Sequence, residues 1–186
     1  MKYLQIILFI VCTQLFSQTA ITKTLGEFSE LKVYDLINVE LIKGSENKIE
    51  ISGANSEHIS IVQKNGTLKI RMKLKYKFNG ADTQVKVYYT GIDIIDANEG
   101  SFIFSKHYIK QYEIFLKAQE GSKISVKTET KRLLVKSVTG STVTAAGTSE
   151  NQEITIRTGG VYKGYNNTAE NTDLSIKYGG EAYVRT

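Results

Sequence analysis

The stretch Leu116-Lys-Ala-Gln-Glu-Gly-Ser-Lys-Ile124 decides the fold of this chain of 186 residues. It holds two short segments of alternating apolar and polar residues, separated by a Glu-Gly-Ser turn. Residues two apart in a strand share a face, so Leu116 and Ala118 point to one side and Lys117 to the other. The glycine supplies the positive φ that a tight turn requires. The stretch therefore predicts a strand, a turn and a second strand.

The same turn returns along the second half of the chain, with glycine spacings of 21, 19, 19 and 20 residues. Self-similarity at a fixed period of about 20 residues is typical of a solenoid, in which each unit is one coil stacked on its neighbours. The turns are Glu99-Gly100-Ser101, Glu120-Gly121-Ser122, Thr139-Gly140-Ser141, Thr158-Gly159-Gly160 and Tyr178-Gly179-Gly180.

Two columns of apolar residues flank these turns and predict the core. The first stands five residues before each glycine and contains Ile95, Leu116, Val135, Ile154 and Leu174. The second stands three residues after it and contains Ile103, Ile124, Val143, Tyr162 and Ala182. A unit of this length is too short for a helix plus a strand, and the β-branched residues favour strands. The sequence predicts an all-β fold, a parallel β-helix whose coils lie about 4.8 Å apart.

Composition agrees with one all-β domain. The chain has no proline, 15 glycines and 41% hydrophobic residues, and no convincing helical periodicity follows its first residues. The first half holds short alternating segments that predict less regular, partly antiparallel strands forming a cap and the first coils. These segments are 31–33, 39–41, 49–51, 59–61, 68–70 and 85–89, and Asn65-Gly66 predicts a hairpin turn between two of them. The lysines that alternate with apolar residues from Leu68 to Phe78 predict a half-buried strand.

Residues 1–17 read as a secretory signal peptide. Lys2 supplies the positive charge of the first region, and an apolar segment runs from Leu4 to Phe16. Ser17 is a small residue at the expected cleavage point. We expect a lead-in at 18–25 and a single domain at 26–186. Cleavage would remove Cys12 and leave 23 basic and 19 acidic residues, a formal charge of +4. The mature chain would then have neither a disulfide nor a cysteine-based zinc site.

Several segments carry a resemblance to a known family. Gly26-Glu-Phe-Ser-Glu-Leu-Lys-Val33, Ile49-Glu-Ile-Ser-Gly-Ala-Asn55, Asn65-Gly-Thr-Leu-Lys-Ile70 and Ile94-Ile-Asp-Ala-Asn-Glu-Gly-Ser101 follow one another in an order that resembles the auto-transporter adhesin head, or GIN-domain, family. The resemblance spans nearly all of the expected mature chain. It implies an exported bacterial envelope protein with a right-handed β-helix, located in the periplasm or at the outer surface, and it supplies no catalytic motif.

Aromatic residues are the candidates for ligand binding. If Ile103 points inward, Phe102 and Phe104 point outward, and Tyr108 and Tyr112 follow within the same coil. Outward aromatic rings on a rigid sheet can stack on sugar rings or anchor a protein partner. The alternative is that residues 105–111 fold back and bury these rings.

Acidic residues offer a second candidate site. Glu99 and Glu120 precede successive glycines, so the repeat places them on adjacent coils, where two carboxylates could share a cation or raise a pKa. The column continues as Thr139, Thr158 and Tyr178, without a third carboxylate. A carbohydrate-active enzyme, a polysaccharide lyase or hydrolase, therefore stays an alternative, while no catalytic residue, metal ligand or cofactor motif is assigned.

The predicted function is a non-enzymatic, adhesin-like module of the cell envelope that binds a glycan or a protein, or associates end to end with itself. A purely structural envelope protein is a further alternative. The small positive charge indicates a solvated surface, and no nucleic-acid motif is present. After signal cleavage we expect no membrane span.

Overall fold

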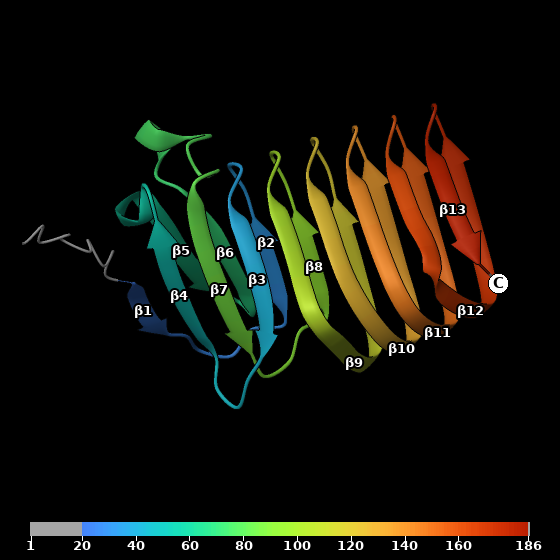
Figure 1. Cartoon of the computed structure of the whole chain (residues 1–186), viewed down its shortest axis with the longest axis horizontal. Coiled ribbons are helices and arrows are strands. Elements are labelled where there is room, and N and C mark those ends of the chain that lie inside the picture. The colour runs from blue at the N-terminus through green and yellow to red at the C-terminus, as the bar shows by residue number, and fades with distance from the viewer. Residues whose placement is uncertain (1–19, 186) are drawn as a thin grey trace, which may run out of the picture.

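The computed structural model describes residues 20–185, which form one continuous 13-stranded sheet wound into a stack of coils (Figure 1). The strands are β1 (Ile21–Thr24), β2 (Glu30–Val33), β3 (Asn38–Lys43), β4 (Lys48–Gly53), β5 (Ile59–Lys64), β6 (Thr67–Met72), β7 (Thr83–Tyr89), β8 (Ile94–Ala97), β9 (Phe102–Ala118), β10 (Lys123–Val138), β11 (Thr142–Arg157), β12 (Val161–Lys177) and β13 (Glu181–Arg185). Two short 3-10 turns, η1 (Ser56–His58) and η2 (Leu74–Tyr76), interrupt the strands. The predicted parallel β-solenoid is confirmed.

The glycine turns of the sequence mark the corners of successive coils. Strands β9 to β13 pair in parallel, and their register aligns the predicted columns: Ile124 lies opposite both Ile103 and Val143. At the turn itself, the Gly121 N–H donates to the Thr139 carbonyl of the next coil at 3.0 Å. Glu120 and Gly121 both have positive φ, as the prediction of a tight turn requires.

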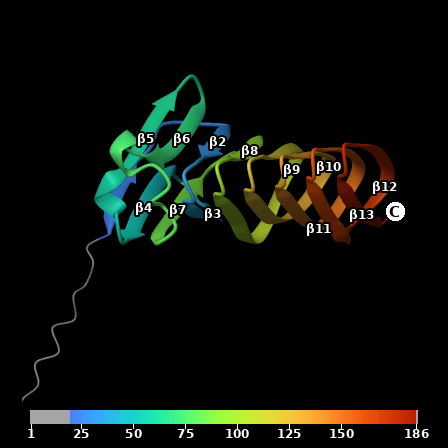
Figure 2. The ribbon, with the colours of Figure 1, turned by 90° about the horizontal axis from the view of Figure 1, so that it is seen from above.

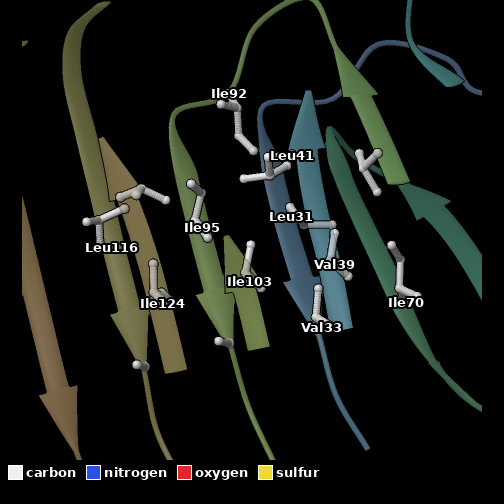
Figure 3. Close-up of a cluster of buried hydrophobic side chains, with 14 of the residues drawn as sticks. Leu31, Val33, Val39, Leu41, Ile70, Ile92, Ile95, Ile103, Leu116 and Ile124 are labelled. Atoms are coloured by element: carbon white, nitrogen blue, oxygen red, sulfur yellow. The ribbon is translucent and has the colours of Figure 1, made fainter. Parts of the chain in front are cut away.

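The core is a stack of mostly aliphatic side chains inside the coils. Figure 3 shows its central part, from Ile70 to Ile124. Leu31, Ile95 and Leu116 come from three coils and are fully buried. The first predicted column fails only at its last member, because Leu174 is 39% exposed. Residues 171–177 of β12 pair with β11, and no strand of residues 20–185 packs on their other side, so Leu174 lacks the neighbouring coil that covers the rest of its column.

The coils do not follow one another in chain order. β2 pairs in parallel with both β6 and β8, and β3 pairs in parallel with both β7 and β9. The coil made by β2 and β3 therefore lies between two coils that come later in the chain, which Figure 1 shows as blue strands between green ones. Its corner is Asp35-Leu36, where both residues have positive φ, and the Leu36 N–H donates to the Glu99 carbonyl at 3.0 Å.

Buried serines connect the corners of adjacent coils. The Ser122 hydroxyl accepts a hydrogen bond from the Gln119 N–H at 3.0 Å and donates to the Ala97 carbonyl of the preceding coil at 2.7 Å. Ser101 donates in the same way to Val33 at 3.1 Å, which identifies β2 as the structural equivalent of β8. Each serine thus joins two coils at a point where the strand ladder is broken by the turn.

The N-terminal end of the stack is antiparallel, as predicted. β4 pairs antiparallel with β1 and β7, and β5 pairs antiparallel with β6. Asn65 and Gly66 have φ of 51° and 74° and form the predicted hairpin turn, which Figure 2 shows standing away from the coils. The half-buried strand expected from Leu68 to Phe78 ends at Met72 instead, and Leu74 is 82% exposed in the 3-10 turn that follows.

Candidate functional site

A groove of about 410 Å³ lies on the outer face of the sheet, where β9 meets β3 and β7. Phe102 and Phe104 form its aromatic part. Their ring centroids are 5.2 Å apart with an interplanar angle of 21°. The other side chains of the groove are polar or aliphatic: Asn38, Glu40, Gln84, Val85, Lys86 and Lys106.

The register of three parallel strands builds this groove. Asn38 lies opposite Phe102 and Gln84, and Glu40 lies opposite Phe104 and Lys86. Between Phe102 and Phe104, Ile103 points into the core and is fully buried. Since side chains alternate along a strand, the two phenyl rings stand on the outer face, as the sequence predicted.

A charged pair flanks the phenyl rings. Lys106 Nζ lies 2.7 Å from Glu40 Oε1 and 5.9 Å from the centroid of the Phe104 ring. Lys86 adds a second cation to the groove. The arrangement places a carboxylate that accepts hydrogen bonds and ammonium groups that donate them beside a stacked aromatic surface.

Residues 105–111 do not fold back, so the alternative considered for this segment is wrong. β9 runs without interruption from Phe102 to Ala118, and the extra residues form only a register shift opposite β10. Tyr108 and Tyr112 are therefore 45% and 70% exposed. These two tyrosines do not line the groove. They lie further along β9, beyond the register shift, where Tyr108 is opposite Lys127 of β10.

The acidic candidates Glu99 and Glu120 stand at the corners of adjacent coils. On its other side, Glu99 has a second acidic neighbour, Asp35. Asp35 occupies the same corner position on the coil of β2 and β3, so the acidic column has a third member. The repeat pattern of the sequence does not reveal it, because Leu36 stands where the other corners have glycine. Glu99 Oε1 lies 3.0 Å from Lys77 Nζ, while Glu99 Oε2 is buried without a hydrogen-bond partner.

Asp35 is a fully buried carboxyl group. Its two oxygens accept hydrogen bonds from the Met72 N–H at 3.0 Å and the Phe78 N–H at 3.4 Å, and Arg71 Nε is 3.8 Å away. Burial and the neighbouring Glu99 raise the pKa of Asp35, and the two backbone hydrogen bonds only partly oppose this shift. The neutral form of the Asp35 carboxyl group is therefore favoured more in the folded protein than in water.

Neither candidate site assembles a metal centre. Within residues 20–185, no group of three or more His, Asp, Glu or Cys side chains is arranged to hold a metal ion. The acidic corner has a depression of about 400 Å³ lined by Leu36, Phe78, Glu99, Gly100 and Glu120.

The predicted signal peptide and Cys12 lie outside the described residues. In the described part of the chain, no helix is long and apolar enough to cross a membrane.

The fold and the groove define a class of protein: a β-solenoid with a ligand-sized aromatic groove on an outer sheet. The profile of the family described as "Putative auto-transporter adhesin, head GIN domain" matches residues 27–186. The chain belongs to this family, as its sequence motifs indicated. No curated protein matches the chain.

Solved structures share the fold. A "putative adhesin" from Bacteroides fragilis is 13% identical with a TM-score of 0.75, and the match covers 89% of this chain and 97% of that one. A "putative adhesin" from Parabacteroides merdae is 16% identical with a TM-score of 0.67, covering 88% and 79%. A "putative lipid binding protein" from Parabacteroides distasonis is 12% identical with a TM-score of 0.68, covering 89% and 81%.

Proposed function

We propose that this protein is a non-enzymatic, adhesin-like module of the bacterial envelope that binds a glycan in the groove at Phe102 and Phe104. The observation that carries the proposal is the stacked phenyl pair with a lysine and carboxylate beside it. Aromatic faces pack against the apolar faces of sugar rings, and the charged groups can exchange hydrogen bonds with sugar hydroxyls. Family membership supports an adhesin-like role for an exported bacterial protein.

The geometry of the acidic corner favours binding over catalysis. Glu99 is held by Lys77, and Asp35 is enclosed by backbone donors, so the two carboxyl groups are structural partners within the fold. Paired carboxylates that hydrolyse a glycosidic bond must stand on opposite sides of the substrate. The aromatic groove is a separate feature, built from β3, β7 and β9.

The test is a glycan array probed with the purified protein and with the Phe102→Ala/Phe104→Ala variant. We expect the variant to lose about tenfold or more in affinity for the glycans that the wild-type protein retains, because two stacking surfaces disappear. Tyr178→Ala is the matched control, since Tyr178 is 77% exposed at a turn away from the groove. Equal loss in both variants, or binding unaffected in the phenylalanine variant, would contradict this site. Release of shorter sugars that is lost in Glu99→Gln would support the enzyme instead.

A further inference from the structure

A second aromatic pair lies on the same outer face as the groove. Tyr165 and Tyr183 have ring centroids 5.1 Å apart with an interplanar angle of 37°. The Tyr183 hydroxyl donates to Glu181 Oε2 at 2.9 Å. Each end of the face therefore carries two adjacent rings beside a carboxylate, Glu40 at the first pair and Glu181 at the second.

The parallel register connects the two pairs through one row of residues. The row runs Phe104, Ser125, Thr144, Lys163, Tyr183, and the adjacent row runs Phe102, Lys123, Thr142, Val161, Glu181. The residues between the rows, from Ile103 to Tyr162, belong to the buried column, so both rows face outward. With coils about 4.8 Å apart, the four register steps from Phe104 to Tyr183 span about 19 Å.

The middle of this face is positively charged. Lys123 and Lys163 are both exposed, and neither forms an ion pair with another residue in the described range 20–185. The two rows contain no carboxylate between the aromatic pairs. Lys123 and Lys163 lie on adjacent rows and on coils two steps apart along the solenoid axis.

We infer that this face is an extended track for an acidic polysaccharide that lies along the solenoid axis, an inference that rests on the proposed function of the groove. The coil spacing of about 4.8 Å is close to the length of one sugar residue in an extended chain, so successive sugars can repeat in step with successive coils. The aromatic pairs stack on the sugars at the two ends. Lys123 and Lys163 neutralise carboxylates carried by sugars between them, and the serine and threonine hydroxyls face the remaining sugar hydroxyls.

A series of oligogalacturonates from the dimer to the octamer tests the track by isothermal titration calorimetry, with the uncharged cello-oligosaccharides as the neutral series. We expect affinity for the acidic series to rise with length until the oligomer reaches both aromatic pairs, at the pentamer or hexamer. Tyr165→Ala/Tyr183→Ala should lower the affinity for the octamer about tenfold and leave the dimer unchanged. Lys123→Gln/Lys163→Gln should lower octamer affinity about tenfold at low salt, with a smaller loss at high salt.

Two further variants make the outcomes distinguishable. Phe102→Ala/Phe104→Ala should weaken dimer and octamer alike, and Tyr178→Ala should change neither. If the dimer binds through the phenylalanine pair but affinity does not grow with length, the track is overturned and the proposed function stands. If no oligogalacturonate binds, the track is overturned, and the glycan array decides the proposed function separately. Because Lys123 and Lys163 are exposed strand residues, their substitution keeps the fold, which circular dichroism checks.

Discussion

At the scale of single residues, the core column shows how one aromatic replacement is accommodated. Tyr162 occupies the position that Ile124 and Val143 hold in the preceding coils and is fully buried. Its hydroxyl donates to Gln152 Oε1 at 3.2 Å, so the buried polar atom has a partner. Burial raises the pKa of this hydroxyl far above its ordinary value of 10.0.

Gly164 provides the space that the Tyr162 ring occupies. A Cβ at position 164 would stand 2.5 Å from a ring carbon of Tyr162 and 2.7 Å from its hydroxyl oxygen. We expect Gly164→Ala to lower the free energy of unfolding by about 1–3 kcal/mol, because the ring is enclosed and cannot move aside. Urea denaturation measures this. Gly91→Ala is the control: nothing lies within 4 Å of the new Cβ, so its effect should stay within about 0.5 kcal/mol.

The Asp35 and Glu99 pair predicts a pH dependence of stability. The pKa of Asp35 is raised above 3.8, so the folded protein binds more protons than the unfolded chain, and stability from this group falls as pH rises through and above 3.8. Glu99→Gln removes the neighbouring negative charge and lowers that pKa.

We therefore expect the stability of Glu99→Gln relative to wild type to increase as the pH rises from about 4 to about 7. Urea unfolding across this range is the measurement. Glu120→Gln is the control, because Glu120 lies one coil further from Asp35 and should show a flat difference. A Glu99→Gln difference that declines with pH would show that Glu99 does not raise the pKa of Asp35.

At the scale of elements, the corner turn is the repeated unit of the solenoid. Each corner holds two successive residues with positive φ, the second of which is glycine in five corners and Leu36 in a sixth. The first residue varies from the fully buried Asp35 to Tyr178, which is 77% exposed. A non-glycine residue in this conformation carries strain, and a β-branched one carries most.

Thr139 stands in such a strained corner with a φ of 54°. Asparagine adopts the left-handed region more readily than threonine, so we expect Thr139→Asn to raise the free energy of unfolding by about 1 kcal/mol. Thermal unfolding followed by circular dichroism checks this. Thr148→Asn, at an exposed site within β11, should give no gain, because asparagine is disfavoured in strands.

The sequence predicted the strands of both halves, but it did not predict the order in which the coils stack. A glycine at each corner, with an aliphatic residue on either side, is a pattern that can be read within a few residues. This local pattern was sufficient to predict the coils from β8 to β12. Asp35-Leu36 lacks the glycine, and its coil is completed by strands remote in the chain, which no local pattern reveals. Side-chain alternation along the strand predicted that Phe102 and Phe104 point outward. The groove also contains Asn38, Glu40 and Gln84, which the sequence did not predict because β3 and β7 lie far from β9 in the chain.

At the scale of the whole molecule, the solenoid is a linear stack in which each coil contacts only its neighbours. Stability in such arrays is a sum of coil and interface contributions, and it declines toward an end with few contacts. β10 is paired along most of its length on both sides. Within residues 20–185, β13 pairs only with β12, through four register positions.

Hydrogen exchange followed by mass spectrometry should reveal this gradient. We expect the amides of β9 and β10 to be protected to the level of global unfolding, and those of β13 to exchange through local opening. The β5–β6 hairpin is an internal comparison, because β5 pairs only with β6 and should exchange early as well. Protection in β13 equal to that in β10 would show that the stack unfolds as a single unit.

The position of the β2–β3 coil between later coils also sets when the protein can fold. A chain synthesised from its N-terminus emerges with β2 and β3 first, yet their partners begin at Thr67, Thr83, Ile94 and Phe102. Loop closure over such separations is slow, and until then these strands have no neighbours on either side. Roughly the first hundred residues must be available before the centre of the stack can form. The topology thus imposes a delay during which both edges of β2 and of β3 stay unpaired and the core at the centre of the stack stays open.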